Sequence, residues 1–182
     1  MKSEKIIIET ERLIVREFVL DDYKDVYEFN SNVELHQFTG DEIIASEERA
    51  KEIIQDIWFQ DYENYGYGRW AVLYKPKDKV IGFAGLKFLP EINETDIGFR
   101  FLPEYWGKGI ASEVAKEIIK FGFENLNLNR IIGIAMPQNI GSCKVLEKIG
   151  LTFLKLDTYD HGSEFYNWYA LDKVTYEDKK GK

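Results

Sequence analysis

A short glycine-containing segment, residues 103–112, carries the clearest chemical signal in this chain of 182 residues. It follows the apolar run 97–102, which predicts a buried strand, and it precedes a stretch whose apolar residues recur with helical spacing. A loop that enters a helix leaves backbone N–H groups without intrahelical acceptors, and the helix dipole favours negative charge there. Gly107 and Gly109 allow close approach to the backbone, and Lys108 adds a positive charge. The segment predicts either a cradle for a phosphate or pyrophosphate, or a tight turn that binds nothing.

The residues around the glycines narrow the type of cradle. No Gly-Lys-Ser/Thr ending is present, which argues against a nucleoside-triphosphate P-loop. A dinucleotide loop has a third glycine where this chain has Ser112, and it follows an early strand. Residues 106–111, Trp-Gly-Lys-Gly-Ile-Ala, instead resemble the acetyl-coenzyme A loop of the GNAT superfamily of N-acetyltransferases, usually Gln/Arg-x-x-Gly-x-Gly/Ala. Trp106 departs from that pattern, and Tyr-Trp-Gly-Lys-Gly is similar to the form found in the RimJ/RimL-type branch.

Two further segments carry the same resemblance. Residues 10–16, Thr-Glu-Arg-Leu-Ile-Val-Arg, followed by the pair Asp21-Asp22, are similar to the opening of the RimJ/RimL-type branch. Residues 139–151 resemble the superfamily's Asn-x-x-Ser/Ala-x-x-(Leu/Val)-x-Glu-Lys-x-Gly-Phe segment, with Leu151 in place of the usual Phe. The three segments occur in the expected order and together span most of the chain.

The resemblance implies an α/β (α+β) fold with a mixed, mostly antiparallel central sheet, a splayed parallel strand pair and flanking helices. Hydrophobic periodicity predicts strands at residues 13–18, 69–74, 80–86, 94–102, 131–135, 151–156 and 164–171. Helices are predicted at 22–29, 46–62 and 111–126, and from 139 or 142 to 149. Strand 131–135 is all apolar, which predicts a parallel neighbour and a right-handed βαβ unit. Residues 1–172 are expected to form a single domain, and 173–182 a loosely attached polar tail.

The resemblance also implies acetyl-CoA as the cofactor and assigns residues to it. Its pyrophosphate is expected on the backbone N–H groups of Trp106, Gly107, Lys108, Gly109, Ile110, Ala111 and Ser112. Its pantetheine amides are expected along a strand that bends away from its neighbour, at Phe99, Arg100 and Phe101. One N–H group there would also meet the oxyanion of the reaction. Asn139 and Ser142 are expected to lie at the cofactor as well.

The implied reaction is the direct attack of a neutral amine on an acetyl thioester, through a tetrahedral oxyanion that expels coenzyme A thiolate. An ammonium of pKa about 8 to 10 must first lose its proton. Glu94 and Asp96 are candidate bases, and Asp96 better matches the acidic position that the superfamily keeps before Ile-Gly-Phe/Tyr. Both residues could equally be solvated charges at a strand end. His36 and His161 titrate in a useful range, but loop histidines are more typical of a surface.

The departing thiolate also needs a proton. Many GNAT enzymes use a tyrosine at the position that is Leu146 here, so that acid is missing. Ser142 resembles the RimJ/RimL-type arrangement, although it and Asn139 could also simply cap the helix. Cys143 is expected to be a small buried residue rather than a nucleophile. The missing tyrosine keeps a second interpretation open, a catalytically weak acyl-CoA-binding or sensing module, and a generic nucleotide-binding domain ranks third.

Composition limits the partners. The net charge of −8 argues against a general nucleic-acid binder and suits a cationic amine acceptor, either a small molecule or a protein N-terminus. A single cysteine cannot form an internal disulfide, and no apolar run is long enough to cross a bilayer, so we expect a cytoplasmic protein without a membrane partner. No metal site is predicted, and the oligomeric state stays open, a homodimer included.

Acceptor specificity is expected to lie in residues 31–67 and 157–163, where no motif is recognised. Six aromatic side chains in the first of these segments either line a pocket or belong to the core and its rim: Phe38, Trp58, Phe59, Tyr62, Tyr65 and Tyr67.

Overall fold

Eight strands form one sheet in the part of the chain that the structure describes. The computed structural model describes residues 5–38, 43–159 and 162–181, and the strand order is β1-β2-β3-β4-β5-β6-β8-β7. The strands are β1 Ile6–Glu9, β2 Leu13–Arg16, β3 Arg69–Tyr74, β4 Lys79–Leu89, β5 Glu94–Phe101, β6 Arg130–Ala135, β7 Thr152–Thr158 and β8 Phe165–Asp172. Among these strands only β5 and β6 pair in parallel. The expected mixed, mostly antiparallel sheet is confirmed.

The helices flank this sheet. They are α1 Tyr23–Asn30, α2 Glu47–Glu52, α3 Phe59–Tyr65, α4 Ile110–Glu124, α5 Ile140–Lys148 and α6 Lys173–Lys180. A π-helical stretch, Ile53–Trp58, joins α2 to α3 in one helical run. The predicted start of that run is confirmed, because the Ser46 hydroxyl accepts the Arg49 N–H at 3.2 Å. Its end lies later than predicted, at Gly66, whose φ of 77° terminates α3.

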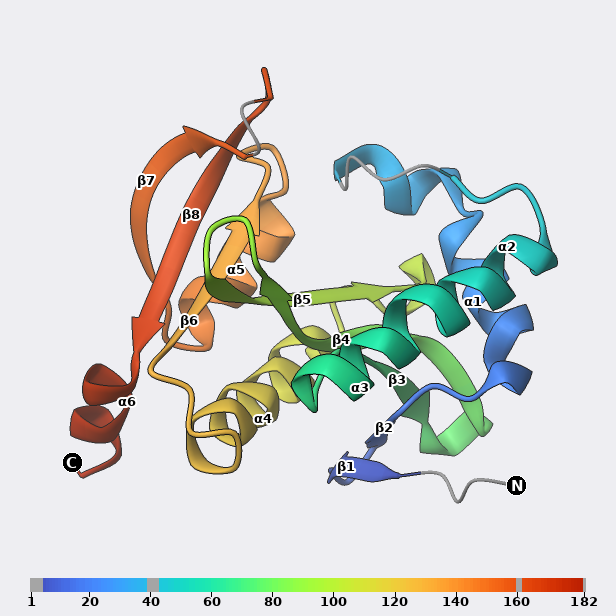
Figure 1. The fold of residues 1–182 in the computed structure, drawn as a ribbon, viewed down its shortest axis with the longest axis horizontal. Helices are drawn as coiled ribbons and strands as arrows, with labels where there is room; N and C mark the ends of the chain where they lie inside the picture. The colour runs from blue at the N-terminus through green and yellow to red at the C-terminus, as the bar shows by residue number, and fades with distance from the viewer. Residues whose placement is uncertain (1–4, 39–42, 160–161, 182) are drawn as a thin grey trace.

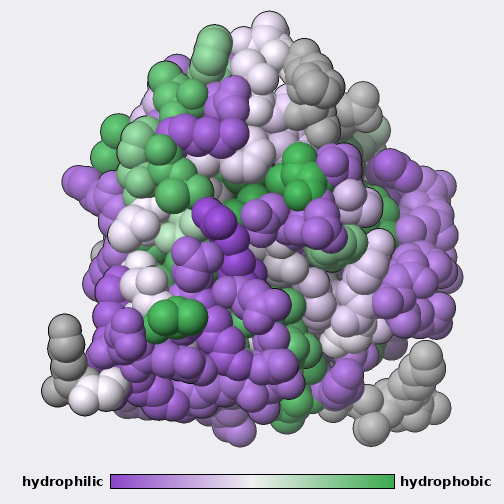
Figure 2. Space-filling model, turned by 60° about the vertical axis from the view of Figure 1, so that its left-hand side comes forward, coloured by the Kyte–Doolittle hydropathy of each residue, from purple (hydrophilic) through white to green (hydrophobic). Residues whose placement is uncertain are grey.

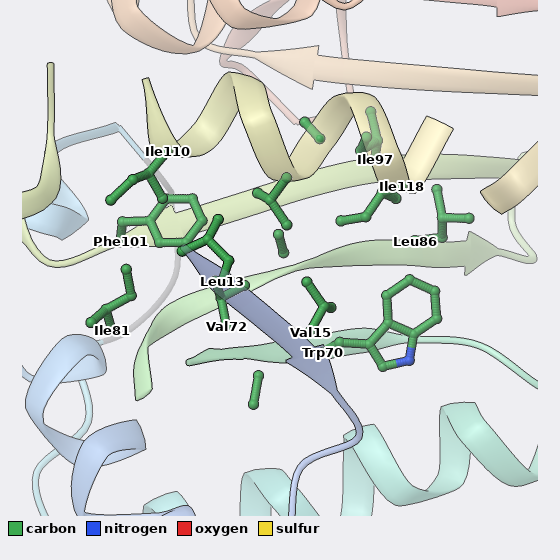
Figure 3. Packing of buried hydrophobic residues seen from close by; sticks show 14 of the residues in the cluster. Leu13, Val15, Trp70, Val72, Ile81, Leu86, Ile97, Phe101, Ile110 and Ile118 are labelled. Atoms are coloured by element: carbon green, nitrogen blue, oxygen red, sulfur yellow. The ribbon is translucent and has the colours of Figure 1, made fainter. Parts of the chain in front are cut away.

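Helix α4 covers one face of the sheet, as its apolar stripe predicts. Its buried side is formed by Ile110, Val114, Ala115, Ile118, Ile119, Gly122 and Phe123. In Figure 3, Ile110 and Ile118 point from α4 toward the strands that carry Phe101 and Leu86. The indole of Trp70 on β3 meets the ring of Phe121 edge-on, with centroids 5.6 Å apart. This packing fixes where the first turn of α4 lies relative to the end of β5.

The opposite face is covered by α1 and the helical run 47–65. Trp58 stacks on Phe18 with ring centroids 4.0 Å apart and meets Phe83 of β4 at 6.1 Å. Phe29 of α1 reaches the same Phe83 ring at 6.1 Å. Aromatic side chains therefore anchor this helical layer and hold it over β4.

Strands β5 and β6 separate soon after they meet. Their register contains one Cα pair, Asp96 with Ile132, whereas β4 stays paired with β5 from Glu94 to Phe101. Strand β6 pairs instead with β8 along residues 130–135. Figure 1 shows β6 and β8 running obliquely to β5 at the left of the view, with α1 and α2 at the right. Among the described residues, the β6-facing edge of 97–101 has no strand partner, and the predicted splayed pair is confirmed.

The prediction for the first strand is wrong in two respects. Strand β1 precedes it, and β2 ends at Arg16 rather than at Phe18. Thr10 makes the tight connection, because its N–H donates to the Leu13 carbonyl at 2.9 Å and its hydroxyl accepts the Leu13 N–H at 3.0 Å. After β2 the guanidinium of Arg16 holds the carboxylate of Asp22 through bonds of 2.7 and 2.8 Å, which draws the chain into a 3₁₀ turn.

The expectation of a loosely attached tail is wrong for residues 173–180, which form α6. The ring of Tyr176 stacks on Phe123 of α4 with centroids 4.8 Å apart. Its hydroxyl donates to Glu124 at 2.7 Å, and Lys180 pairs with the same carboxylate at 2.5 Å. The composition of this segment is mostly polar, which predicted a loose tail, but its one aromatic side chain, Tyr176, packs on α4.

The surface around the outer strand β7 is mixed in polarity. Its large exposed apolar side chains, with one from β8, are Phe153, Leu154, Leu156 and Phe165. Figure 2, in which the β7 side of Figure 1 is turned forward, shows green side chains in separate groups among purple ones. Within the described ranges, no helix has the length and apolar character needed to cross a bilayer.

Candidate active site

A cavity of about 840 Å³ opens where β5 and β6 separate. Its walls combine β5, the start of α5, the end of β6 and the helical run 47–65. Phe99 and Arg100, two of the residues expected along pantetheine, lie in the wall. Phe101 does not, because its side chain is buried in the core and its carbonyl accepts the Trp106 indole N–H at 2.7 Å. The splay therefore turns a strand edge into one side of a cavity.

Asp96 is buried in this wall and forms an ion pair with Arg69, whose Nη2 donates to Asp96 Oδ2 at 2.5 Å. Burial raises the pKa of Asp96, and the neighbouring guanidinium opposes that shift. The alternative of a solvated strand-end charge is therefore wrong for Asp96. It describes Glu94 instead, which is partly exposed, lies 3.8 Å from Arg130 and does not line the cavity. The structure thus separates two carboxylates that sequence spacing had grouped together.

Gly98 makes room for this buried ion pair. A Cβ at this position would lie 2.4 Å from Arg69 Nη2, so a larger residue would displace the guanidinium. Arg69 Nη1 also donates to the Gly85 carbonyl of β4 at 2.6 Å. The ion pair is therefore built from the packing of three neighbouring strands, β3, β4 and β5.

Asp61 of α3 is a cavity residue that sequence reasoning missed. Its Oδ2 atom is buried and has no hydrogen-bond partner within the described part of the chain. Burial raises the pKa of Asp61, and Lys87 and Arg69 oppose that shift. Lys87, on β4 directly opposite Asp96, also lines the cavity. No sequence signal distinguishes Asp61 from the other acids of the same helical run.

The start of α5 brings three predicted residues to the cavity: Asn139, Ser142 and Leu146. Asn139 is the N-cap, because its Oδ1 accepts the Ser142 backbone N–H at 3.0 Å. The alternative that the Ser142 side chain caps the helix is therefore wrong, and Ser142 is one of the cavity-lining residues. Leu146 is buried in the wall, so no hydroxyl occupies that position, while Tyr166 of β8 adds a phenol to the lining. Cys143 is buried, as expected.

The loop between β5 and α4 is exposed at residues 106–109. Gly107 and Gly109 have φ values of 69° and 76°, and a Cβ added at either would meet no atom within 4 Å. These left-handed conformations favour glycine. Gly109 is the N-cap of α4, and the backbone N–H groups of residues 107–112 donate to no acceptor in the described protein. The expectation of a free Trp106 N–H is wrong, because it donates to the Pro103 carbonyl at 3.0 Å. Lys108 Nζ lies 5.7 Å from the centre of the Tyr105 ring, which keeps a positive charge beside these donors.

These features fit a pyrophosphate, which needs several unpaired donors, open space and positive charge in one place. The loop 106–112 does not line the cavity, but the 3₁₀ turn Pro103–Tyr105 joins it to β5, of which residues 96–100 do. Strand β5 therefore leads along the chain from the cavity toward the loop. A ligand with a pyrophosphate at one end and an extended amide-bearing arm would match both.

Other predicted site residues lie apart from the cavity. His36 contacts the Asn30 carbonyl through its ring at 2.7 Å and is not in the cavity wall, and His161 is outside the described residues. Of the six aromatic side chains considered, Phe38 and Trp58 line the cavity. The other four, which pack elsewhere, are Phe59, Tyr62, Tyr65 and Tyr67. No group of three metal-ligating side chains is found in the ranges that the structure describes.

The comparisons with known proteins agree with this geometry. The family described as acetyltransferase (GNAT) domain matches residues 12–152. The uncharacterized N-acetyltransferase YnaD of Bacillus subtilis (strain 168) is 35% identical over 145 residues, which are 79% of this chain and 81% of YnaD.

Solved structures show the same fold. A GNAT-family acetyltransferase from Bacillus anthracis superposes with a TM-score of 0.77 at 28% identity, covering 92% of this chain and 98% of the other. The ribosomal L7/L12 α-N-protein acetyltransferase RimL, in complex with coenzyme A, superposes with a TM-score of 0.80 at 15% identity, covering 94% and 99%. The matched residues include the glycine loop and the α5 start, and the chain belongs to the GNAT family of acetyltransferases.

Proposed function

We propose that this protein acetylates a primary amine, on a small molecule or at a protein N-terminus, by direct attack of the amine on acetyl-CoA. One observation carries the proposal: the unpaired backbone donors at 107–112 follow, after one 3₁₀ turn, the end of β5, and β5 lines a cavity that contains two carboxylates. When bound, acetyl-CoA supplies the acetyl group as a thioester. The family to which the chain belongs supports that choice of donor.

The chain's own backbone would hold the donor at two places. The N–H groups of residues 107–112 would bind the pyrophosphate, since they have no protein acceptors and Lys108 adds positive charge. The edge of 97–101 would bind the pantetheine amides, and a backbone N–H there would stabilise negative charge on the carbonyl oxygen. Removal of one such hydrogen-bond donor commonly raises the activation free energy by on the order of 3 kcal/mol.

The carboxylates of the cavity would take the proton of the acceptor amine. Asp96 is fixed by Arg69, and its raised pKa makes it a better proton acceptor than an exposed carboxylate. Asp61 offers an oxygen without a hydrogen-bond partner in the same cavity and would attract the ammonium form of the acceptor. Glu94 has no part in this scheme because it lies outside the cavity.

Ser142 would relay a proton to the departing thiolate and regain one from the amine nitrogen of the tetrahedral intermediate. Ser142 lines the cavity, and its side chain does not cap α5, because the Asn139 side chain does so. A thiol pKa of roughly 8.5 makes the thiolate a fair leaving group, so one weak hydroxyl donor is sufficient at the α5 start.

A second candidate function is a non-catalytic acyl-CoA-binding module. The observation in its favour is Leu146, an apolar side chain in the cavity wall at the position where the family resemblance implies a tyrosine. This module would bind acetyl-CoA through the same loop and strand edge but would release no thiol.

The two functions are separated by measuring binding and thiol release on the same protein. Isothermal titration with acetyl-CoA should give binding, with ATP and NAD as controls that should not bind. Free thiol should then be released in the presence of a diamine, an amino acid amide or a peptide with a free N-terminus, which also reports the acceptor class. Binding without thiol release across that panel would support the module, and binding of ATP but not acetyl-CoA would refute both functions.

A further inference from the structure

The turn between β1 and β2 reaches across the molecule to the first turn of α4. Arg12 Nε and Nη2 donate to Glu113 Oε2 at 2.9 and 2.5 Å, although the two residues are 101 positions apart. Thr10 Oγ1 donates to the other oxygen, Glu113 Oε1, at 2.6 Å. Both carboxylate oxygens are therefore held, and the guanidinium has a fixed orientation.

The same guanidinium holds the glycine loop. Arg12 Nη1 and Nη2 both donate to the Lys108 carbonyl oxygen at 3.2 Å. Because a trans peptide is planar, the carbonyl of Lys108 and the N–H of Gly109 point in opposite directions. With the carbonyl directed at Arg12, the Gly109 N–H points away from it. Without this restraint the peptide could rotate about ψ of Lys108 and φ of Gly109, and a glycine tolerates a wide range of φ.

We propose that Arg12 is a positioning residue for the coenzyme A loop, in which it fixes the Lys108–Gly109 peptide so that the Gly109 N–H faces the pyrophosphate. Glu113 and Thr10 orient Arg12 for that task. The inference rests on the proposed use of acetyl-CoA. It also assigns a role to the Thr-Glu-Arg segment before β2, which the cavity does not use.

Two simpler roles for Arg12 make different predictions. If Arg12 only attracts the pyrophosphate by its charge, removal of the neighbouring Glu113 carboxylate should strengthen binding, because the positive field increases. If Arg12 only stabilises the fold, its removal should affect every acetyl donor alike. If Arg12 positions the loop, removal of the Glu113 carboxylate should weaken acetyl-CoA binding. Removal of Arg12 should reduce activity only with acetyl donors that carry the pyrophosphate.

The experiment compares Arg12→Ala, Arg12→Lys and Glu113→Ala with the wild type by isothermal titration of acetyl-CoA. Arg12→Ala should weaken binding about tenfold or more, and Glu113→Ala about threefold or more. Arg12→Lys should also weaken it, since an ammonium cannot hold Glu113 and the Lys108 carbonyl together in a planar fork. Lys5→Ala is the matched control, because it removes one cation and one exposed ion pair, with Glu17 at 2.8 Å, next to the same hairpin. It should bind normally.

A second measurement uses S-acetylpantetheine, which lacks the pyrophosphate, as the acetyl donor. Its turnover per unit enzyme should be the same for Arg12→Ala and the wild type, while kcat/KM for acetyl-CoA falls. Equal losses with the two donors, wild-type affinity in Arg12→Lys, or tighter binding in Glu113→Ala would each overturn the positioning role. A wild type that binds no acetyl-CoA would remove the proposed function, and this inference with it.

Discussion

The loop 106–112 and the cavity at the β5–β6 splay use two different kinds of chemistry. The loop presents backbone N–H groups. The space beside its glycines is open, since a Cβ added at Gly107 or Gly109 would meet no atom within 4 Å. The cavity presents side chains from six or more separate elements, among them a buried ion pair and a buried carboxylate oxygen. The loop depends on conformation, whereas the cavity depends on which distant residues meet.

This difference suggests how each region tolerates substitution. A backbone site is lost when its φ angles change, whatever side chain is present. A side-chain site is lost when one functional group is removed, even if the backbone is untouched. Three predictions test that contrast, beginning with the largest expected effect.

The first prediction concerns Gly109→Val. Valine at a φ of 76° is strained by about 1–2 kcal/mol, so the loop should move to another conformation and the N–H groups should no longer converge. Acetyl-CoA affinity should fall by about a hundredfold or more, since two hydrogen bonds to a charged group are lost. Isothermal titration measures the affinity, and circular dichroism checks that the protein is folded.

Gly66→Val is the matched control for this substitution. Gly66 has a φ of 77°, and a Cβ there also meets no atom within 4 Å, but it ends α3 and is not in the loop. It should lose a similar amount of stability and keep its affinity for acetyl-CoA. Equal affinity losses in the two variants would mean that strain alone, rather than the loop, explains the effect.

The second prediction concerns Ser142→Ala. Turnover should fall roughly ten- to a hundredfold, at the lower end of general-acid effects because the thiolate is a fair leaving group. Acetyl-CoA affinity and the melting temperature should hardly change, since Asn139 rather than Ser142 caps α5. Asn139→Ala, by contrast, should cost about 1 kcal/mol of stability. An unchanged turnover number in Ser142→Ala would remove Ser142 from the catalytic scheme.

The third prediction concerns the pH dependence of Asp61→Asn. Burial raises the pKa of Asp61 above its ordinary value of 3.8, so the folded state holds this proton more tightly than the unfolded state. The stability contributed by the protonated carboxyl is present below 3.8 and is lost as the pH rises through the folded pKa. Asp61→Asn should therefore melt at a higher temperature than the wild type at pH 7.

That difference in melting temperature should shrink as the pH falls toward 3.8, where the wild-type carboxyl is also neutral. Thermal unfolding at several pH values measures it. Asp56→Asn makes the same chemical change at an exposed position in the same helical run and should show no such trend. A wild type that is the more stable protein at pH 7 would show that the charge of Asp61 is compensated in the cavity.

The sequence by itself determined the features that depend on local geometry. Glycine spacing after an apolar strand predicted the loop, and the stripe from Ala115 to Phe123 predicted α4 and its buried face. Both features could be predicted from the sequence, because a left-handed φ favours glycine at one position and a helix repeats its buried residues at a fixed spacing. Strand β1 and helix α6 were not predicted. Short or polar segments are stabilised by packing against distant elements, and α6 packs in this way through Tyr176, whose ring stacks on Phe123.

The tertiary structure decided which side chains meet. Asp96 and Glu94 are two residues apart, yet only Asp96 is buried against Arg69 and lines the cavity. The contacts of Arg12 with Glu113 and the Lys108 carbonyl join residues that no local pattern relates. Burial and partners depend on the path of the whole chain, and these two quantities, rather than residue type, determine what a carboxylate or a guanidinium does.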